Sequence, residues 1–151
     1  MNLEILRQEI ESDEGCKYET YHCSEGHLTG GIGHLITEWD EEIYAGPIGT
    51  VIPEQQVKDW FERDVHIAVN DCISIFDNFD NLPEDAQHVF INMAFQLGGP
   101  RLRKFKKMIA AVNDGDWDEA AAQMEDSRWY KQTTNRATRL IDRIIRIGVP
   151  A

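Results

Sequence analysis

Residues 13–34 read DEGCKYETYHCSEGHLTGGIGH, and this stretch decides how the chain is interpreted. It combines acidic residues, two cysteines, three histidines and a glycine-rich tail. Side chains of these types bind metals, form disulfides or act as acids and bases. The central question is whether Cys23 is a metal ligand, half of a disulfide or a catalytic group.

The composition is that of a globular protein. With 151 residues, 42% hydrophobic and 28% charged, the chain is expected to form one compact domain, either undivided or split into two lobes. No apolar run approaches the roughly 18–20 residues of a membrane span. The first residues, MNLEILRQEIESDEG, lack a basic segment followed by an apolar one, so we expect no signal peptide and a cytoplasmic location.

Three cysteines, Cys16, Cys23 and Cys72, are too few for a disulfide scaffold. An odd number in a chain without a leader favours free thiols, although a Cys16–Cys23 bridge is sterically conceivable.

The net charge of −12 is unevenly distributed. Residues 1–100 carry four basic and 20 acidic side chains, whereas residues 101–151 carry 11 basic and seven acidic ones. The overall charge argues against broad nucleic-acid binding. The cluster RLRKFKK (101–107) is either an attraction site for an anionic polymer or a solvated helix face.

Hydrophobic spacing predicts the order of the elements. Residues 3–14 favour a helix that ends at Gly15, and residues 17–37 favour short strands joined by tight turns. Residues 38–52 read as a short helix or loop and then a turn, and a helix of about 20 residues follows Pro53. Three further helices are predicted over 82–99, 116–130 and 133–148, the last with Thr133 or Thr134 as N-cap.

The predicted fold class is therefore α+β. We expect a small N-terminal lobe with a β-hairpin sheet (about 12–58), a long connecting helix and a mainly helical C-terminal lobe (about 59–151 with 1–11). A cleft between the lobes is the expected ligand site.

Glu14 lies at the predicted end of the first helix. The negative end of the helix dipole and partial burial would raise its pKa, which suits a general acid. Cys23 follows nine positions later and Thr29 six positions after that. A turn at residues 24–26 brings the three side chains together, and the tail GGIGH permits close backbone approach to a ligand.

The pattern DEG–Y–EG–T–GIGH resembles the phage lysozymes of the T-even coliphage type, glycoside hydrolase family 24. The resemblance continues in order at INMAFQLG (91–98), WDEAA (117–121) and SRWYKQTTNRATRLI (127–141). It covers nearly the whole chain, with Thr134 where a proline is common. It implies a lysozyme-like fold without a cofactor.

The resemblance also implies an activity. The family hydrolyses the β-1,4 bond between N-acetylmuramic acid and N-acetylglucosamine in peptidoglycan, with inversion, for bacterial cell lysis. Glu14 then matches the general acid, Cys23 the second catalytic group, usually Asp, and Thr29 the residue that holds the attacking water. A thiol has an ordinary pKa near 8.5, and nearby acidic groups are expected to raise it. Cys23 is therefore either a weak base or a group that positions water.

The remaining correspondences concern substrate binding and support. Leu35 and Phe95 match positions that contact the sugar chain, and Gln96 is placed to donate to an acetamido or hydroxyl oxygen. The supporting residues implied are a His34–Asp64 ion pair linking the lobes, Arg136 near the general acid, and a Glu25–Arg128 pair across the cleft mouth. Met108 and Gln123 depart from the family's usual serine and asparagine, which affects substrate preference.

Three alternatives compete with this interpretation. A zinc site would use Cys16, His22, Cys23, His27 and His34, but their spacing does not match paired metal ligands, so no metal is expected. A non-catalytic peptidoglycan-binding module would explain the missing Asp. A lytic transglycosylase would replace water by intramolecular attack.

The resemblance implies few partners. These are peptidoglycan glycan strands and a holin, which is needed functionally for release; we expect a monomer that binds no nucleic acid and does not insert into membranes. The expected location is the host cytoplasm before lysis, with action on the cell wall.

Overall fold

The computed structural model describes residues 1–149, which form two compact units. The sheet unit comprises residues 3–66, and the helical unit comprises residues 1–2 together with the chain from Ile67 onward. This division differs from the expected lobes in two ways. The first helix belongs with the sheet, and the boundary falls after His66, near the middle of the long helix, rather than near residue 58.

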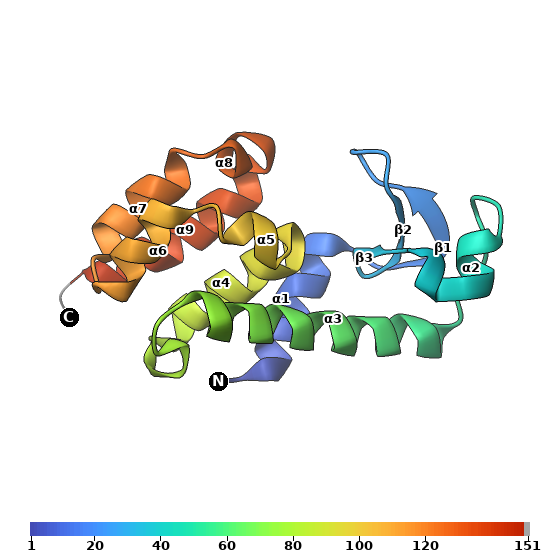
Figure 1. Ribbon diagram of the computed structural model, residues 1–151, viewed down its shortest axis with the longest axis horizontal. Helices are drawn as coiled ribbons and strands as arrows, with labels where there is room; N and C mark the ends of the chain where they lie inside the picture. The colour runs from blue at the N-terminus through green and yellow to red at the C-terminus, as the bar shows by residue number, and fades with distance from the viewer. Residues whose placement is uncertain (150–151) are drawn as a thin grey trace. The chain divides into compact units, whose positions relative to one another are not determined.

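The sheet unit begins with helix α1 (Leu3–Glu14), which ends as predicted: Gly15 follows with φ +75°. Strands β1 (Lys17–His22), β2 (Leu28–Gly31) and β3 (His34–Leu35) form an antiparallel sheet in the order β1-β2-β3 (Figure 1). The predicted α+β class is therefore confirmed, with a small three-stranded sheet in a mainly helical chain.

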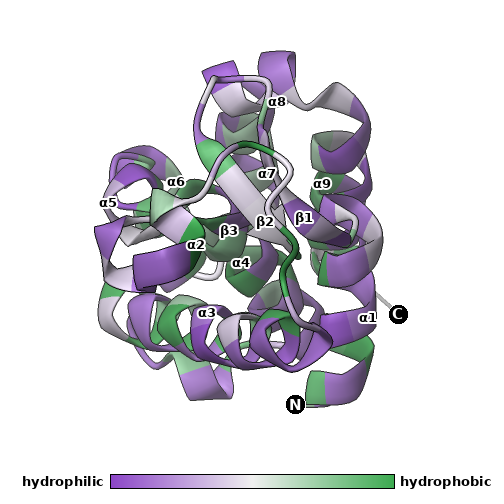
Figure 2. Ribbon diagram, turned by 90° about the vertical axis from the view of Figure 1, so that its right-hand side faces the viewer, coloured by the Kyte–Doolittle hydropathy of each residue, from purple (hydrophilic) through white to green (hydrophobic). Residues whose placement is uncertain are grey.

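Short helices connect the sheet to the long helix. They are η1 (Glu38–Asp40) and α2 (Glu41–Ala45), followed by α3 (Glu54–Ile75), which has 22 residues. Thr37 caps η1 in a reciprocal capping box with Asp40. The ribbon of α3 changes repeatedly between hydrophilic and hydrophobic colours along its length (Figure 2), because apolar residues recur three or four positions apart.

The helical unit contains the rest of the described chain. Its elements are η2 (Phe79–Asn81), α4 (Glu84–Leu97), α5 (Gly99–Leu102), α6 (Lys106–Asn113), α7 (Trp117–Glu125), α8 (Arg128–Gln132) and α9 (Thr134–Gly148). Helix α4 supplies much of the core, since every residue from Ala86 to Met93 is buried, and Ala94 is too. Within residues 1–149, no helix combines the length and apolar character needed to cross a bilayer.

The C-terminal helices differ from the prediction at one break. The single helix expected over 116–130 is wrong, because α7 and α8 are separated at Asp126–Ser127. The Ser127 hydroxyl donates to the Met124 carbonyl (2.6 Å) and accepts from the Tyr130 amide (3.1 Å), so it starts a new helix. Thr133 precedes α9 as predicted, but its hydroxyl donates back to the Trp129 carbonyl (3.0 Å).

Candidate active site

The β1–β2 hairpin places two predicted site residues, Cys23 and Thr29, on the same face as their neighbour Tyr21. Tyr21 pairs with Thr29, and the Cys23 amide donates to the His27 carbonyl (2.9 Å), so one register continues to the turn. The turn closes at Gly26, whose φ is +82° and whose amide donates to the Cys23 carbonyl (2.8 Å). Because side chains alternate along a strand and paired residues share a face, Tyr21, Cys23 and Thr29 point to the same side.

The carboxyl group of Glu14 lies against the glycine-rich tail. A Cβ atom at Gly33 would stand only 2.7 Å from Glu14 Oε1, and Gly33 has φ +61°. A side chain at residue 33 would therefore have to displace the Glu14 carboxyl group and adopt a left-handed backbone conformation that favours glycine. The end of α1 therefore lies next to the glycine-rich tail, and the approach of a ligand to GGIGH stays a prediction.

The Cys23 thiol is only partly buried, and its pKa lies below the ordinary value. Burial, and to a smaller extent the negative charge of Glu25, raise this pKa. Hydrogen bonds from the backbone amides of Glu25 and His27 and from the Thr29 hydroxyl lower it by more. Glu25 raises the Cys23 pKa, as expected of a neighbouring acid, but the net direction is downward, opposite to the expected increase. Amides aimed at the sulfur stabilise the thiolate more than the carboxylate disfavours it.

Thr29 is buried, with 6% of its surface exposed. Its hydroxyl donates to the His27 carbonyl (2.8 Å). A hydroxyl has one proton, so this carbonyl and the Cys23 sulfur compete for it. Thr29 therefore links the turn of the hairpin to the thiol.

His34 anchors the sheet from its buried side. Its Nδ1 lies 2.6 Å from Asp64 Oδ2, its Nε2 lies 3.3 Å from Asp40 Oδ2, and its ring stacks on Trp60 with centroids 4.2 Å apart. The predicted His34–Asp64 pair is present, but both residues belong to the sheet unit, so the pair does not link the two units. The second carboxylate, Asp40, was not predicted.

The other predicted site residues occupy separate elements. Leu35 is 54% exposed on β3, opposite Thr29, and Phe95 is partly buried in α4. Gln96 accepts a hydrogen bond from Trp129 Nε1 (2.9 Å), which fixes its carbonyl oxygen and leaves its amide as a donor. The predicted role of Gln96 as a donor to substrate is compatible with this orientation.

The charged supporting residues also have local contacts. Arg136 donates to Asn92 Oδ1 from Nε (3.0 Å) and Nη2 (2.7 Å), and Glu25 lies 3.8 Å from His27. Arg128 is exposed at the start of α8. Proximity of Arg136 to the general acid and pairing of Glu25 with Arg128 stay predictions.

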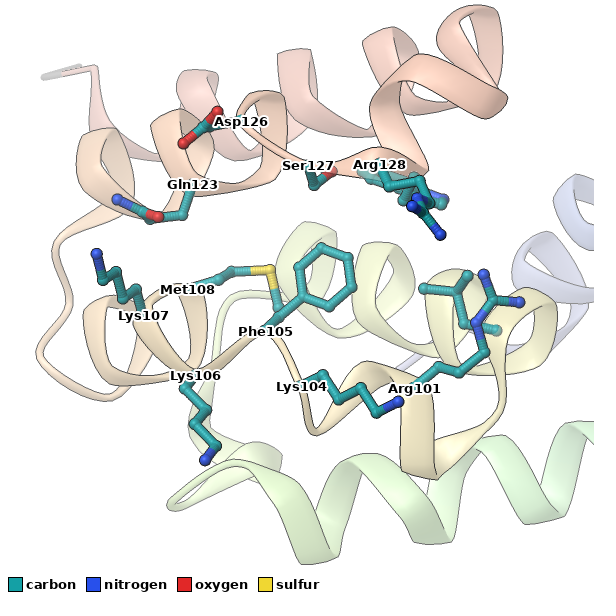
Figure 3. A pocket seen from close by; sticks show the side chains of 12 residues that line it. Arg101, Lys104, Phe105, Lys106, Lys107, Met108, Gln123, Asp126, Ser127 and Arg128 are labelled. Carbon is teal, nitrogen blue, oxygen red and sulfur yellow. The ribbon is translucent and has the colours of Figure 1, made fainter.

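A groove of about 510 Å³ lies within the helical unit (Figure 3). Phe105 and Met108 occupy its centre, and the side chain of Gln123 faces it from α7. Its cations are Arg101, Lys104, Lys106, Lys107 and Arg128. Among residues 1–149 none of these five forms an ion pair, so their charge is available to an anion. The sequence indicated the cluster 101–107, but not that α8 completes it.

The structure also bears on the metal and disulfide alternatives. Cys16, Cys23 and Cys72 are free thiols, and burial raises the pKa of Cys72. Within residues 1–149, no three His, Cys, Asp or Glu side chains are grouped so as to hold a metal ion.

Comparisons with known proteins cover most of the chain. Residues 11–144 match the family model described as phage lysozyme. Probable T4-type lysozyme 2 of Dictyostelium discoideum is 32% identical over 154 residues, covering 90% of this chain and 91% of that protein.

Two longer phage proteins are also similar. The pre-baseplate central spike protein Gp5 of Enterobacteria phage T4 is 33% identical over 91% of this chain but only 26% of its own length. Peptidoglycan hydrolase gp36 of Pseudomonas phage phiKMV is 30% identical over 91% of this chain and 15% of its own length.

Proposed function

The chain belongs to the phage lysozyme family, and from this premise we propose that it hydrolyses the β-1,4 bond between N-acetylmuramic acid and N-acetylglucosamine in peptidoglycan, with inversion. Lysozyme-like hydrolysis of peptidoglycan is the activity that the family and its relatives support. The single observation that carries the specific reaction is the hairpin. It presents Cys23 and Thr29 on one face, and Glu14 rests on the adjacent Gly33.

Glu14 is the proposed general acid. Protonation of the glycosidic oxygen by a carboxylic acid makes the departing sugar a better leaving group. The absence of a side chain at Gly33 leaves room for the carboxyl group beside the sheet, which matters because proton transfer needs hydrogen-bond distance.

Cys23 is the proposed base for the attacking water. In an inverting glycosidase the second group takes a proton from water on the opposite face of the sugar, and no covalent intermediate forms. The lowered pKa of Cys23 increases the thiolate fraction near neutral pH, which favours the role of base over that of a neutral positioning group. Thr29, whose hydroxyl oxygen retains acceptor capacity, is proposed to hold that water.

Leu35, Phe95 and the Gln96 amide are the proposed contacts with the sugar chain. The unpaired cations of the groove support attraction to the anionic cell wall, since peptidoglycan stem peptides carry carboxylates. Two residues of this groove differ from those usual in the family. Met108 replaces a serine and is less polar, and Gln123 replaces an asparagine and has a longer side chain.

The decisive experiment compares wild type, Glu14→Gln and Glu11→Gln on purified peptidoglycan. Loss of the acid is expected to reduce turnover by about a thousandfold or more, because general acid catalysis and positioning both fail. Glu11 is exposed on the same helix, so Glu11→Gln is expected to keep full activity. Full activity in Glu14→Gln would refute the mechanism.

Product analysis tests the reaction type. New reducing ends indicate hydrolysis, whereas an anhydro sugar indicates a lytic transglycosylase. Binding to peptidoglycan without either product would identify a non-catalytic module.

For its biological role, we propose an endolysin that acts as a monomer, is held in the host cytoplasm and reaches the wall after a holin opens the membrane. The similarity to a segment of the Gp5 spike protein favours a second candidate, wall digestion during phage entry. Lysis timing in cells that express the protein with and without a holin distinguishes the two.

A further inference from the structure

Tyr21 is a residue to which the sequence analysis assigned no role. It lies on β1 directly opposite Thr29 and two positions before Cys23. The Tyr21–Thr29 and Cys23–His27 pairings belong to one register, so the phenol and the thiol share a face of the hairpin. Tyr21 is therefore next to both hairpin residues assigned to the reaction.

We propose that Tyr21 is a positioning residue, whose hydroxyl faces the Glu14 carboxyl group and the Cys23 sulfur and orients the thiolate for catalysis. This inference rests on the proposed function of Glu14 and Cys23. It adds a third polar group to the acid and the base.

The ring of Tyr21 is held in a defined position. Lys17 Nζ lies 4.6 Å from the ring centroid, four residues earlier on the same strand. A cation over one face of the ring restrains its tilt. The aromatic body is partly buried, so the hydroxyl is the part of the side chain left to meet polar groups.

The electrostatic surroundings keep the phenol protonated. Burial raises the pKa of Tyr21, and the negative charges of Glu14 and Cys23 raise it further. A phenol has an ordinary pKa near 10, so the hydroxyl stays a neutral donor throughout the pH range in which the enzyme is expected to work. Charged or titratable neighbours include Lys17 over the ring, His22 at the end of β1, and Glu25 and His27 in the turn.

A second donor is needed on this face because Thr29 has a single proton. The His27 carbonyl, at 2.8 Å, competes with the sulfur for that proton. The backbone amides of Glu25 and His27 approach the sulfur from the turn. In the proposal, the Tyr21 hydroxyl adds a donor from the strand side, so that the thiolate is oriented from two sides.

The test compares wild type, Tyr21→Phe and the control Tyr18→Phe. Phenylalanine keeps the ring and its contact with Lys17, so only the hydroxyl is removed. Tyr18 is an exposed tyrosine on the same strand and is expected to be dispensable. Circular dichroism melting curves verify that each variant is folded.

The first readout is the rate of Cys23 alkylation by iodoacetamide as a function of pH, followed by mass spectrometry. Tyr21→Phe is expected to move the Cys23 titration upward by about one pH unit, since a donor to the thiolate is lost. Tyr18→Phe is expected to leave it unchanged. Identical profiles for all three proteins would overturn the proposal.

The second readout is peptidoglycan hydrolysis across pH. Tyr21→Phe is expected to lower kcat about tenfold with KM nearly unchanged and to shift the rising limb of the pH profile by the same amount as the alkylation curve. A tenfold loss without either pH shift would indicate a structural role and also overturn the proposal. If wild type does not hydrolyse peptidoglycan, the proposed function fails, while the alkylation profiles still test the contact.

Discussion

The hairpin around Cys23 and the groove around Phe105 are two polar surfaces built in opposite ways. At the hairpin, backbone amides, a threonine hydroxyl and a glycine fix a few reactive groups. At the groove, five cations surround an apolar centre, and none of them forms an ion pair with another residue of 1–149. The hairpin is therefore suited to catalysis, which needs fixed geometry. The groove is suited to attracting an anionic polymer, which needs mainly charge.

The largest expected effect concerns the base itself. Cys23→Asp is expected to keep or raise activity and to move the rising limb of the pH profile to clearly lower pH, because a carboxylic acid has an ordinary pKa near 4 and a thiol one near 8.5. Activity rises as the base loses its proton, so the limb follows the pKa of residue 23. A turbidity assay on permeabilised Gram-negative cells between pH 4 and 9 measures this. An unchanged limb would show that residue 23 does not titrate in the reaction.

The next effect tests how closely the hairpin fixes Glu14. Gly33→Ala is expected to lower activity about a hundredfold, because the new Cβ displaces the carboxyl group by a fraction of an ångström or more. Gly115→Ala is a matched control, since Gly115 also has a left-handed φ, +73°, but open space around its Cα. Both variants are expected to lose about 1 kcal/mol of stability. Only Gly33→Ala is expected to lose activity. Equal activities would contradict the assigned position of Glu14.

A smaller effect concerns the buried support of the sheet. Asp64→Asn is expected to destabilise the fold by about 2–3 kcal/mol, because His34 loses its shortest partner. Glu54→Gln removes an exposed pair with Lys58 and is expected to change stability by less than about 0.5 kcal/mol. Urea unfolding of both variants measures the difference. Equal losses would show that burial adds nothing to the His34 pair.

The smallest effect belongs to the groove. A Lys104→Glu, Lys107→Glu double variant is expected to weaken binding to insoluble peptidoglycan about three- to tenfold at low salt, with the difference fading as salt rises. A Lys131→Glu, Arg146→Glu variant changes the net charge equally outside the groove. A cosedimentation assay with both variants separates position from net charge. Equal weakening would mean that overall charge, not the groove, attracts the wall.

Much of the fold follows from local sequence signals. The end of α1 at Glu14, the strand-rich segment after it and the long helix after Pro53 depend on glycine, proline and hydrophobic period, all visible in the sequence. The break before α8 was missed because Ser127 sits in an otherwise continuous helical pattern, and only its cap hydrogen bonds show that it starts a helix.

The candidate site was less predictable where it depends on tertiary contacts. The resemblance to phage lysozymes indicated Glu14, Cys23 and Thr29, but the sequence did not show the direction in which the Cys23 pKa moves, because the aim of backbone amides depends on the folded turn. Tyr21 could have been found from its position two residues before Cys23. Asp40 could not, since its approach to His34 depends on the path of the loop between them.

Asp40 has a consequence for exchanging parts of this protein. Its carboxylate accepts from the Thr37 amide (2.9 Å), lies 3.3 Å from His34 Nε2 and 3.9 Å from Arg63 Nη2, and is 7% exposed. One acid thus ties a strand, a loop and the long helix to a shared point. A loop graft between β3 and α3 will succeed only if residues 37–40 are transferred together. The effects of substitutions at the three partners on stability will not be additive.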